Sequence, residues 1–168
     1  MPILVLGLSH HATPVAVRER FAFDAAGVPA ALESLRGSGA ADEAVILSTC
    51  NRVEIYAATP REPSRALAGL REFLLASQDS SDARIGGIYA LSEPQSVQHL
   101  FRVACGLDSM VLGETEVLGQ LKQAYELARQ HGHTGARLNR AFQRAFNVAK
   151  HIRTQTNIQR GSVSVGSV

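Results

Sequence analysis

The chain has 168 residues, of which 45% are hydrophobic and 19% are charged, and its formal net charge is +2. That length and apolar content suffice for one compact domain. No apolar run approaches the roughly 20 residues of a membrane span, and no basic leader opens the chain, so we expect neither a membrane segment nor a signal peptide.

The first half of the chain predicts an alternation of strands and helices. Runs rich in Val, Ile and Leu predict strands at 3–9, 42–49, 52–59 and 86–91. Cap signals and amphipathic spacing predict helices at 13–23, 29–36 and 62–77. The resulting β-α-β-β-α-β order is that of a ferredoxin-like split unit. We therefore predict an α+β fold whose ferredoxin-like subdomain contains a mixed sheet.

The second half predicts helices. Residues 92–95, Ser-Glu-Pro-Gln, fit a capping box that would start the next helix. Residues 113–130 hold one or two helices, and 138–152 carry an apolar stripe with arginines on another face. We predict that these helices form a subdomain after the ferredoxin-like unit. The last residues, 162–168, stop in mid-pattern without a cap or a polar tail, which indicates a cut at a domain boundary.

Basic residues are concentrated near the carboxy terminus. Residues 127–168 contain seven Lys and Arg and no Asp or Glu, whereas residues 1–126 contain ten basic and fifteen acidic residues, so the two parts carry +7 and −5. A segment of one sign favours a polyanionic partner. The alternative is a solvated helix face whose acidic partners come from elsewhere in the fold.

Cys50 is the residue that most strongly suggests chemistry. It ends an apolar run at a predicted strand end and is followed by Asn51 and Arg52, which are bonding rather than packing types. A guanidinium beside a thiol favours the thiolate, the nucleophilic form of sulfur. The alternative is a small core residue, since free cysteines are often buried. The polar neighbours favour the reactive thiol.

The other cysteine, Cys105, lies inside a predicted helix, and we interpret it as core packing. Two cysteines in such unlike contexts argue against a disulfide framework and favour the cytoplasm. His10 and His11 end the first predicted strand, but no third ligand has fitting spacing, so we assign no metal site.

Four segments resemble the glutamyl-tRNA reductase family. They are GLSHHATPVAVRE at 7–19, LSTCNRVEIY at 47–56, HLFRVACGLDSMVLGE at 99–114 with LGQ at 118–120, and LNRAFQRAFNVAKHIRTQT at 138–156. The matches are long, ordered and spread over nearly the whole chain. The resemblance implies an NADPH-dependent oxidoreductase that starts tetrapyrrole (5-aminolevulinate) synthesis.

In that reaction a thiol attacks the ester between glutamate and the tRNA 3′ end, and NADPH reduces the resulting thioester to glutamate-1-semialdehyde. By motif position, the resemblance implies that Cys50 is the nucleophile. It also implies that His99 is a catalytic histidine that stabilises the thiolate, orients the ester or carries a proton. The implied partners are glutamyl-tRNA, a second copy in a homodimer, and glutamate-1-semialdehyde aminomutase, which receives the product.

The resemblance further implies a substrate site. Its predicted members are Thr49, Cys50, Asn51, Arg52, Ser109, Glu114, Thr115, Glu116 and Gln120. Arg52 suits bidentate binding of the glutamate side-chain carboxylate, and Glu114 suits the ammonium group. Residues 113–116 have the sequence Gly-Glu-Thr-Glu where the family usually has Gly-Glu-Pro-Gln, so Thr115 and Glu116 carry over by position only.

The chain lacks an NADPH fingerprint. Residues 37–42 place glycines like a dinucleotide loop, but they follow a helix, lead into a strand and end in Asp. In the family a nicotinamide-binding domain comes next, followed by a helical dimerisation domain. We therefore predict a catalytic domain at 1–156 and, at 157–168, the start of the linker into a truncated NADPH-binding domain. Alone, the catalytic domain is expected to bind substrate and at most hydrolyse it.

The basic segment supplies the candidates for tRNA backbone contacts, because Lys and Arg neutralise phosphates. They are Arg137, Arg140, Arg144, Lys150 and Arg153. Two other functions remain open beside the reductase. One is a Cys–His thiol esterase or hydrolase, and the other is a non-catalytic RNA-binding module.

Overall fold

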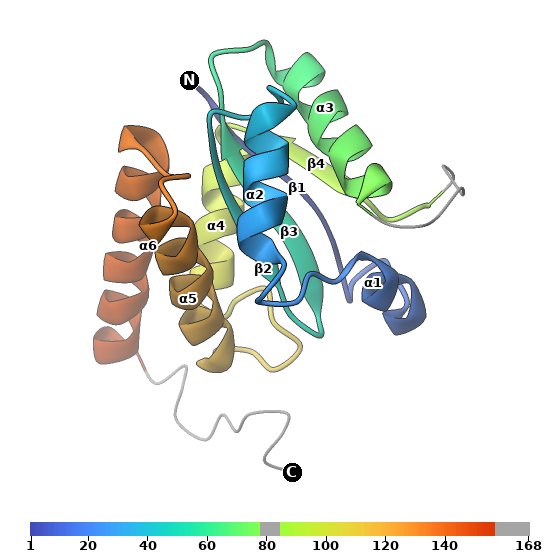
Figure 1. Cartoon of the computed structure of the whole chain (residues 1–168). Coiled ribbons are helices and arrows are strands. Elements are labelled where there is room, and N and C mark those ends of the chain that lie inside the picture. The colour runs from blue at the N-terminus through green and yellow to red at the C-terminus, as the bar shows by residue number, and fades with distance from the viewer. Residues whose placement is uncertain (78–84, 157–168) are drawn as a thin grey trace.

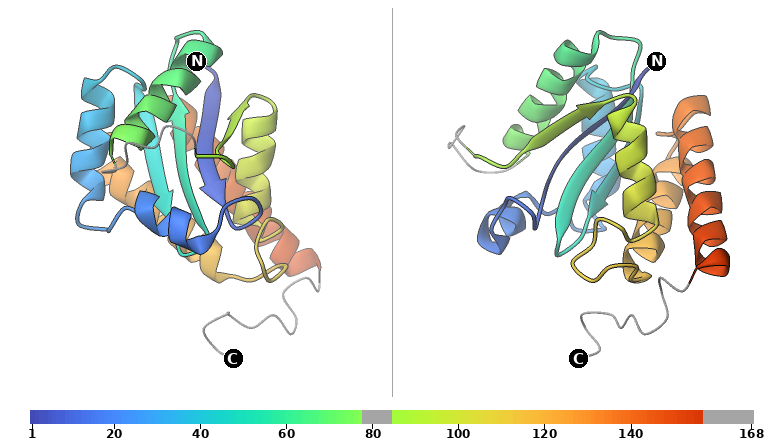
Figure 2. Two further views of the ribbon diagram at one scale, coloured as in Figure 1. Left: turned by 90° about the vertical axis from the view of Figure 1, so that its right-hand side faces the viewer. Right: turned by 180° about the vertical axis from the view of Figure 1, so that it is seen from behind.

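The structure, a computed structural model, describes residues 1–77 and 85–156. A four-stranded sheet lies between two layers of helices (Figures 1 and 2). The strands are β1 (Ile3–Ser9), β2 (Glu43–Ser48), β3 (Arg52–Ala58) and β4 (Tyr89–Ser92). The helices of one layer are α1 (Val15–Phe21), α2 (Val28–Gly37) and α3 (Pro63–Ala76). The helices of the other are α4 (Gln95–Ala104), α5 (Glu116–Gln130) and α6 (Ala136–Gln155).

The strand order is β2-β3-β1-β4, and the predicted α+β class is confirmed. Within residues 1–77 and 85–156, every hydrogen-bonded strand pair is antiparallel, so the prediction of a mixed sheet is wrong. The helical crossover from β1 to β2 makes those two strands parallel, but β3 lies between them and separates them. The split order of the ferredoxin-like unit therefore leaves only antiparallel neighbours.

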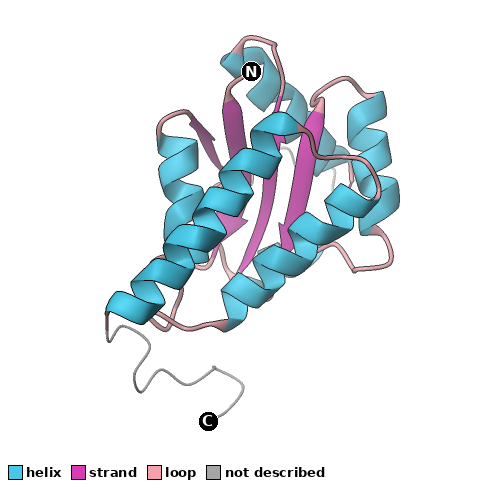
Figure 3. Cartoon of the chain, turned by 90° about the vertical axis from the view of Figure 1, so that its left-hand side faces the viewer, coloured by secondary structure: helices cyan, strands magenta, loops and turns pink. Residues whose placement is uncertain are grey.

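The second helical layer packs directly on the sheet. Figure 3 shows α5 and α6 crossing one face of the strands, and Tyr56 of β3 meets Phe142 of α6 edge to face at 5.4 Å. Phe142 also stacks on Tyr125 of α5 at 5.2 Å. These buried rings join the carboxy-terminal helices to the sheet in one hydrophobic core. Among the described residues, no helix is long and apolar enough to cross a membrane.

The predicted capping box at residues 92–95 is wrong. Ser92 belongs to β4, and α4 begins after Pro94 without a side-chain cap. The polar groups here bind β1 instead: Ile3 N donates to Glu93 Oε1 at 2.8 Å, and Ser96 Oγ donates to Ile3 O at 2.7 Å. Long-range bonds to the first strand thus replace the local cap. Residues 113–130 contain one helix, α5, preceded by a loop.

Candidate active site

The turn between β2 and β3, here named the Cys50 turn (residues 49–51), is held by several hydrogen bonds. Thr49 Oγ1 accepts from the backbone N–H groups of Asn51 and Arg52, each at 3.1 Å. Arg18 of α1 donates from Nε to the Cys50 carbonyl at 3.2 Å. Cys50 itself is exposed, which excludes the core-packing alternative for this thiol. Because the turn is held in place and the thiol is exposed, Cys50 is well positioned to act as a nucleophile.

Cys50 opens onto a cleft of about 310 Å³, here named the Cys50 cleft. Eight of the nine predicted substrate residues line it, together with Met110, Val111 and Val117. The eight are Thr49, Cys50, Asn51, Arg52, Ser109, Glu114, Glu116 and Gln120. Thr115 and His99 are not among its lining residues. The fold therefore gathers segments from the β2–β3 turn, the α4–α5 loop and α5 around one thiol.

Arg52 lies in the wall of this cleft but is almost entirely buried, with 1% of its surface exposed. Its Nη1 donates to Glu54 Oε1 at 3.1 Å and to Asp108 Oδ2 at 3.0 Å, and its Nη2 donates to the Asp108 carbonyl at 2.8 Å. Burial acts to lower the pKa of Arg52, but the charges of Glu54 and Asp108 outweigh it and raise that pKa. Arg52 is thus a permanent buried cation.

Asp108 belongs to the α4–α5 loop, here named the Asp108 loop (residues 105–115). Gly106 and Gly113 have positive φ values of 72° and 76°, and Gly113 N donates to Gly106 O at 3.0 Å. A Cβ on Gly106 would lie 2.7 Å from the Glu114 carbonyl, so only glycine allows this closure. The loop is consequently closed on itself and tied to β3 by Arg52.

Glu114 caps the helix that follows this loop. Its carboxylate accepts from Glu116 N at 2.6 Å and from Val117 N at 3.2 Å. A carboxylate is favoured there because the first N–H groups of a helix lack partners and carry positive partial charge. Glu114 therefore enters the cleft with a fixed orientation.

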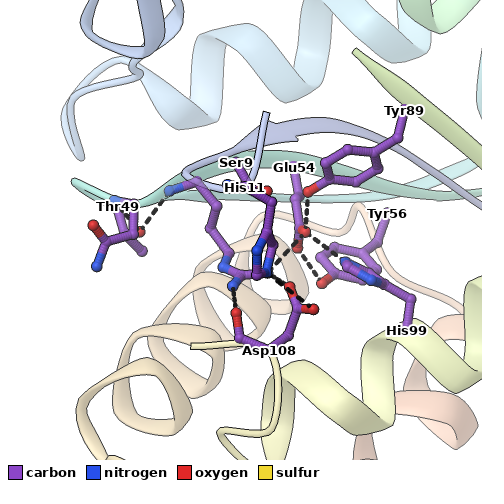
Figure 4. Close-up of polar contacts among 10 residues, drawn as sticks. Ser9, His11, Thr49, Glu54, Tyr56, Tyr89, His99 and Asp108 are labelled. Atoms are coloured by element: carbon purple, nitrogen blue, oxygen red, sulfur yellow. Dashed lines mark hydrogen bonds and ion pairs between the residues drawn. The ribbon is translucent and has the colours of Figure 1, made fainter. Parts of the chain in front are cut away.

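A buried carboxylate, Glu54, is the centre of the polar network behind the cleft. Glu54 Oε1 lies 2.5 Å from His99 Nε2 and accepts from Tyr89 Oη at 2.5 Å, and its Oε2 accepts from Tyr56 Oη (Figure 4). Burial opposes ionisation of Glu54, but its hydrogen bond with His99 and the charges of His99 and Arg52 lower its pKa to about 2. Because Glu54 is ionised, His99 Nε2 carries the hydrogen in this contact.

Both tyrosines donate to this carboxylate. Burial and the adjacent Glu54 charge raise the pKa values of Tyr56 and Tyr89, so their hydroxyls stay protonated. Gly7 leaves room for the contact between Glu54 and Tyr89, because in the sheet it pairs with Glu54 on one side and with Tyr89 on the other. A Cβ on Gly7 would lie 2.6 Å from Val53 O and 2.8 Å from Glu54 Cγ.

Sequence reasoning missed Glu54, Asp108, Tyr89 and Gly7 as members of this network. One signal was present, because Arg52, Glu54 and Tyr56 alternate along a predicted strand and must share one face. A charged pair on a buried sheet face requires partners from another element. The sequence does not identify those partners, since Asp108 lies 56 positions beyond Arg52.

The remaining histidines and Cys105 have their own surroundings. His11 Nε2 lies 3.4 Å from Asp108 Oδ1, while burial, His11 and Arg52 lower the pKa of His10. Cys105 is buried, and that burial raises the pKa of its thiol. Within residues 1–77 and 85–156, no group of three His, Cys, Asp or Glu residues could hold a metal ion.

The basic candidates on α6 divide into two groups. Arg140, Arg144 and Lys150 are exposed, and we name them the basic stripe. Arg137 instead donates to Met1 O at 2.8 Å and pairs with Glu93. Arg153 is half-buried, and its charge acts on the Cys105 thiol. Only the stripe is therefore fully presented for a polyanion.

The residues with glycine spacing do not fit NADPH. Residues 37–42 run from the end of α2 into β2, so they lead into a strand and not into the N-terminus of a helix. Gly39 has a φ of 73°, and a Cβ there would lie 2.9 Å from the Arg61 guanidinium, which accounts for this glycine structurally. A dinucleotide pyrophosphate requires a strand, a glycine turn and then a helix N-terminus.

Comparison with known proteins adds independent findings. The family model described as "Glutamyl-tRNAGlu reductase, N-terminal domain" matches residues 6–156. Glutamyl-tRNA reductase from Xanthomonas campestris pv. phaseoli is 47% identical over 167 residues, which is 99% of this chain and 37% of that protein. The enzyme from Marinobacter nauticus is 46% identical over 98% of this chain and 38% of its own length.

A solved structure gives the same result. The match to glutamyl-tRNA reductase from Methanopyrus kandleri has a TM-score of 0.80 at 33% identity, covering 98% of this chain and 37% of that one. The chain thus spans less than two-fifths of the length of these relatives.

Proposed function

Because this chain belongs to the family of glutamyl-tRNA reductase N-terminal domains, we propose that it performs the acyl-transfer half of the reductase reaction. The observation that carries the proposal is the position of Cys50, an exposed thiol on a braced turn at the wall of a cleft. We propose residues 1–156 as this catalytic domain. Residues 157–168, proposed as the start of a linker, lie outside the described residues.

In the proposed step, Cys50 Sγ bonds to the carbonyl carbon of the glutamyl ester. The bond from that carbon to the ribose oxygen breaks, and the proton lost by the thiol ends on the departing ribose hydroxyl. The product is a glutamyl thioester on Cys50 and free tRNA. A thioester is a more reactive acyl donor than the ester, so the covalent intermediate divides one difficult reduction into two easier steps.

The substrate carboxylate is proposed to bind where Arg52 enters the cleft wall. A guanidinium has five N–H donors, and three of them have partners in Glu54 and Asp108. The remaining donors, with Asn51 and Gln120 in the same wall, suit a carboxylate. Glu114 and Glu116, which also line the cleft, suit the ammonium group, and Ser109 and Thr49 are proposed to bond the reacting group.

We propose a positioning role for His99. Its Nε2 is committed to Glu54, and it is absent from the lining of the Cys50 cleft. Both observations favour action through Glu54 and Arg52 over direct proton transfer to the substrate. Thr115, which is also outside the lining, is proposed to act only as the residue that precedes α5.

The complete reaction needs partners beyond this chain. Reduction of the thioester by NADPH is assigned to other parts of the full-length protein, because residues 37–42, the segment with glycine spacing, do not fit that cofactor. Glutamyl-tRNA is the proposed substrate, and the basic stripe is proposed to contact the phosphates of the tRNA backbone. The homodimer, the transfer of product to glutamate-1-semialdehyde aminomutase and the cytoplasmic location remain predictions.

Intact-protein mass spectrometry tests the proposal. The chain is mixed briefly with glutamyl-tRNA and quenched in acid, alongside Cys50→Ser and Cys105→Ser. A glutamyl adduct is expected on the wild type and on Cys105→Ser, and not on Cys50→Ser. An adduct that persists on Cys50→Ser, or a wild type that binds tRNA in a gel shift yet forms no adduct, would contradict it. Hydrolysis of simple esters without a preference for the glutamyl-tRNA ester would favour the thiol hydrolase instead.

A further inference from the structure

A second cavity adjoins the same thiol and has no role in the mechanism above. Its volume is about 280 Å³, and it lies against α1. We name it the α1 cavity; its lining residues are Val15, Arg18, Glu19, Ala22, Phe23, Ser48, Thr49 and Cys50. The α1 cavity and the Cys50 cleft share only Thr49 and Cys50 in their linings. The thiol therefore stands at the boundary between two hollows.

An ester carries two groups on its carbonyl carbon, the acyl chain and the alcohol that leaves. A nucleophile that attacks this carbon must lie where the two groups meet. The Cys50 cleft supplies two carboxylates, two side-chain amides and a guanidinium that suit the glutamyl group. We infer that the α1 cavity is the leaving-group subsite and that it receives the terminal nucleoside of the tRNA acceptor end. This inference rests on the proposed acyl-transfer function.

The lining of the α1 cavity suits a nucleoside. Phe23 is half-buried, and its ring lies parallel to that of Phe73 at 6.5 Å. Aromatic faces of this kind are the usual platforms for unpaired bases. Val15, with 54% of its surface exposed, adds an uncovered apolar wall. Glu19 is an exposed carboxylate that would accept from ribose hydroxyls or an exocyclic amine.

The α1 cavity is also rigidly connected to the thiol. Arg18 is buried, with 8% of its surface exposed, and it joins the Cys50 carbonyl to the Thr13 carbonyl through Nε and Nη1. Phe23 N donates to Ser48 Oγ at 2.9 Å, which fixes the aromatic residue to the end of β2. An occupant of the cavity would consequently be held at a set distance from the sulfur, as a productive approach requires.

Charge on the same helix agrees with this occupant. Arg20 is exposed on α1 and has no ion pair among the described residues. The phosphate on the 5′ side of the terminal nucleoside would form an ion pair with Arg20. The α1 cavity would thus bind the nucleoside that carries the leaving alcohol, and Arg20 on the same helix would neutralise the adjoining phosphate.

Acylation rates of Cys50 by two small donors test the inference. One donor is 3′-O-glutamyl-adenosine, and the other is a glutamyl thioester of a small alkyl thiol, which has no nucleoside. Phe23→Leu and Val15→Ser remove the platform and the wall, and Val148→Ser changes an exposed apolar residue on α6 as the matched control. Both cavity variants are expected to lose roughly tenfold in acylation by the nucleoside ester, the scale of one lost base-stacking contact, while the small thioester reacts at the wild-type rate.

Each outcome has a separate meaning. Equal losses with both donors would show a structural effect and overturn the inference, as would wild-type rates with both. Protection of Cys50 by nicotinamide mononucleotide but not by adenosine would assign the cavity to the hydride donor and also overturn it. If the wild type reacts with neither donor nor with glutamyl-tRNA, the proposed acyl-transfer function itself fails.

Discussion

Arg52 holds Asp108 through two different groups, the carboxylate at 3.0 Å and the backbone carbonyl at 2.8 Å. The double contact fixes both the side chain and the path of the Asp108 loop. The loop carries Ser109 and Glu114 into the Cys50 cleft. Arg52 therefore sets the relative position of the two walls of the cleft, in addition to any contact with substrate.

Replacing this carboxylate tests that connection. Asp108→Asn keeps the shape and the carbonyl contact but removes the charge shared with Arg52 and His11. We expect thioester formation on Cys50 to slow at least about tenfold, because misplacing a positioned group by around 1 Å costs up to about 100-fold in rate. Asp42→Asn is the control, since Asp42 is exposed and has no side-chain ion pair within the described part of the chain. Equal rates in the two variants would show that the charge does not hold the loop.

The buried Glu54 carboxylate makes stability depend on pH in a defined direction. Its folded pKa of about 2 lies below the ordinary value of 4.5, so between these values the unfolded chain binds more protons than the folded one. Stability from Glu54 is therefore complete above about pH 4.5 and is lost as the pH falls toward 2. Urea unfolding from pH 7 to pH 3 is expected to show this decline.

Glu54→Gln identifies the source of the decline. The variant should unfold more easily at pH 7 by about 3–5 kcal/mol, because it leaves the buried Arg52 charge without its neighbour. It should also show a flatter pH profile below pH 5. Glu72→Gln, an exposed change on α3, should keep the wild-type profile. If Glu54→Gln keeps the full acid dependence, another carboxylate is responsible.

Gly7→Ala should disrupt the same network from the opposite strand. The added methyl group would meet Val53 O and Glu54 Cγ within 3 Å, so β1 or the Glu54 side chain must move. We expect a loss of about 1–3 kcal/mol in unfolding free energy, with reduced thioester formation. Gly119→Ala is the control, because a Cβ there meets nothing within 4 Å and the residue lies inside α5. That change should stabilise by about 0.5–1 kcal/mol, and a destabilised control would undermine the comparison.

The basic stripe predicts a salt-dependent affinity for tRNA. Arg140→Gln and Arg144→Gln should each weaken binding and reduce the slope of log affinity against log salt by about 1. Arg129→Gln provides the matched control, because Arg129 is already paired with Glu126 at 2.6 Å on α5. Filter binding at several salt concentrations gives both quantities. An unchanged slope in the stripe variants would mean that the tRNA approaches elsewhere, for example along α1.

The strands and helices were largely predictable because their patterns are local. The strand predicted at 3–9 coincides with β1, and 52–59 exceeds β3 by one residue. Partnerships between distant residues were not predictable. Ser92 was predicted to cap a helix because residues 92–95 have the spacing of a capping box. In the structure the nearby side chains of Glu93 and Ser96 instead bond to the backbone of Ile3, about 90 positions away.

The candidate site divides in the same way. The residues that line the cleft could be assigned by motif, but the reason for their arrangement lies in Glu54 and Asp108. The strand pattern places Glu54 on the same face as Arg52, whereas no local pattern pairs Asp108 with Arg52. Arg137 shows how the fold changes the surroundings of a charge. Its charge suggested a polyanion contact, yet it bonds to Met1 and Glu93, because neighbours supplied by the fold decide whether a charge is free.

Glu114, which is proposed to bind the substrate ammonium, also caps the first turn of α5, and this second contact offers a way to observe binding in the cleft. Its carboxylate protects the amides of Glu116 and Val117. If the ammonium binds as proposed, it would compete with those two amides for the Glu114 oxygens. Occupancy of the cleft would then be coupled to fraying of the first turn of α5. Amide hydrogen exchange at these two positions would then report cleft filling without any label on the ligand.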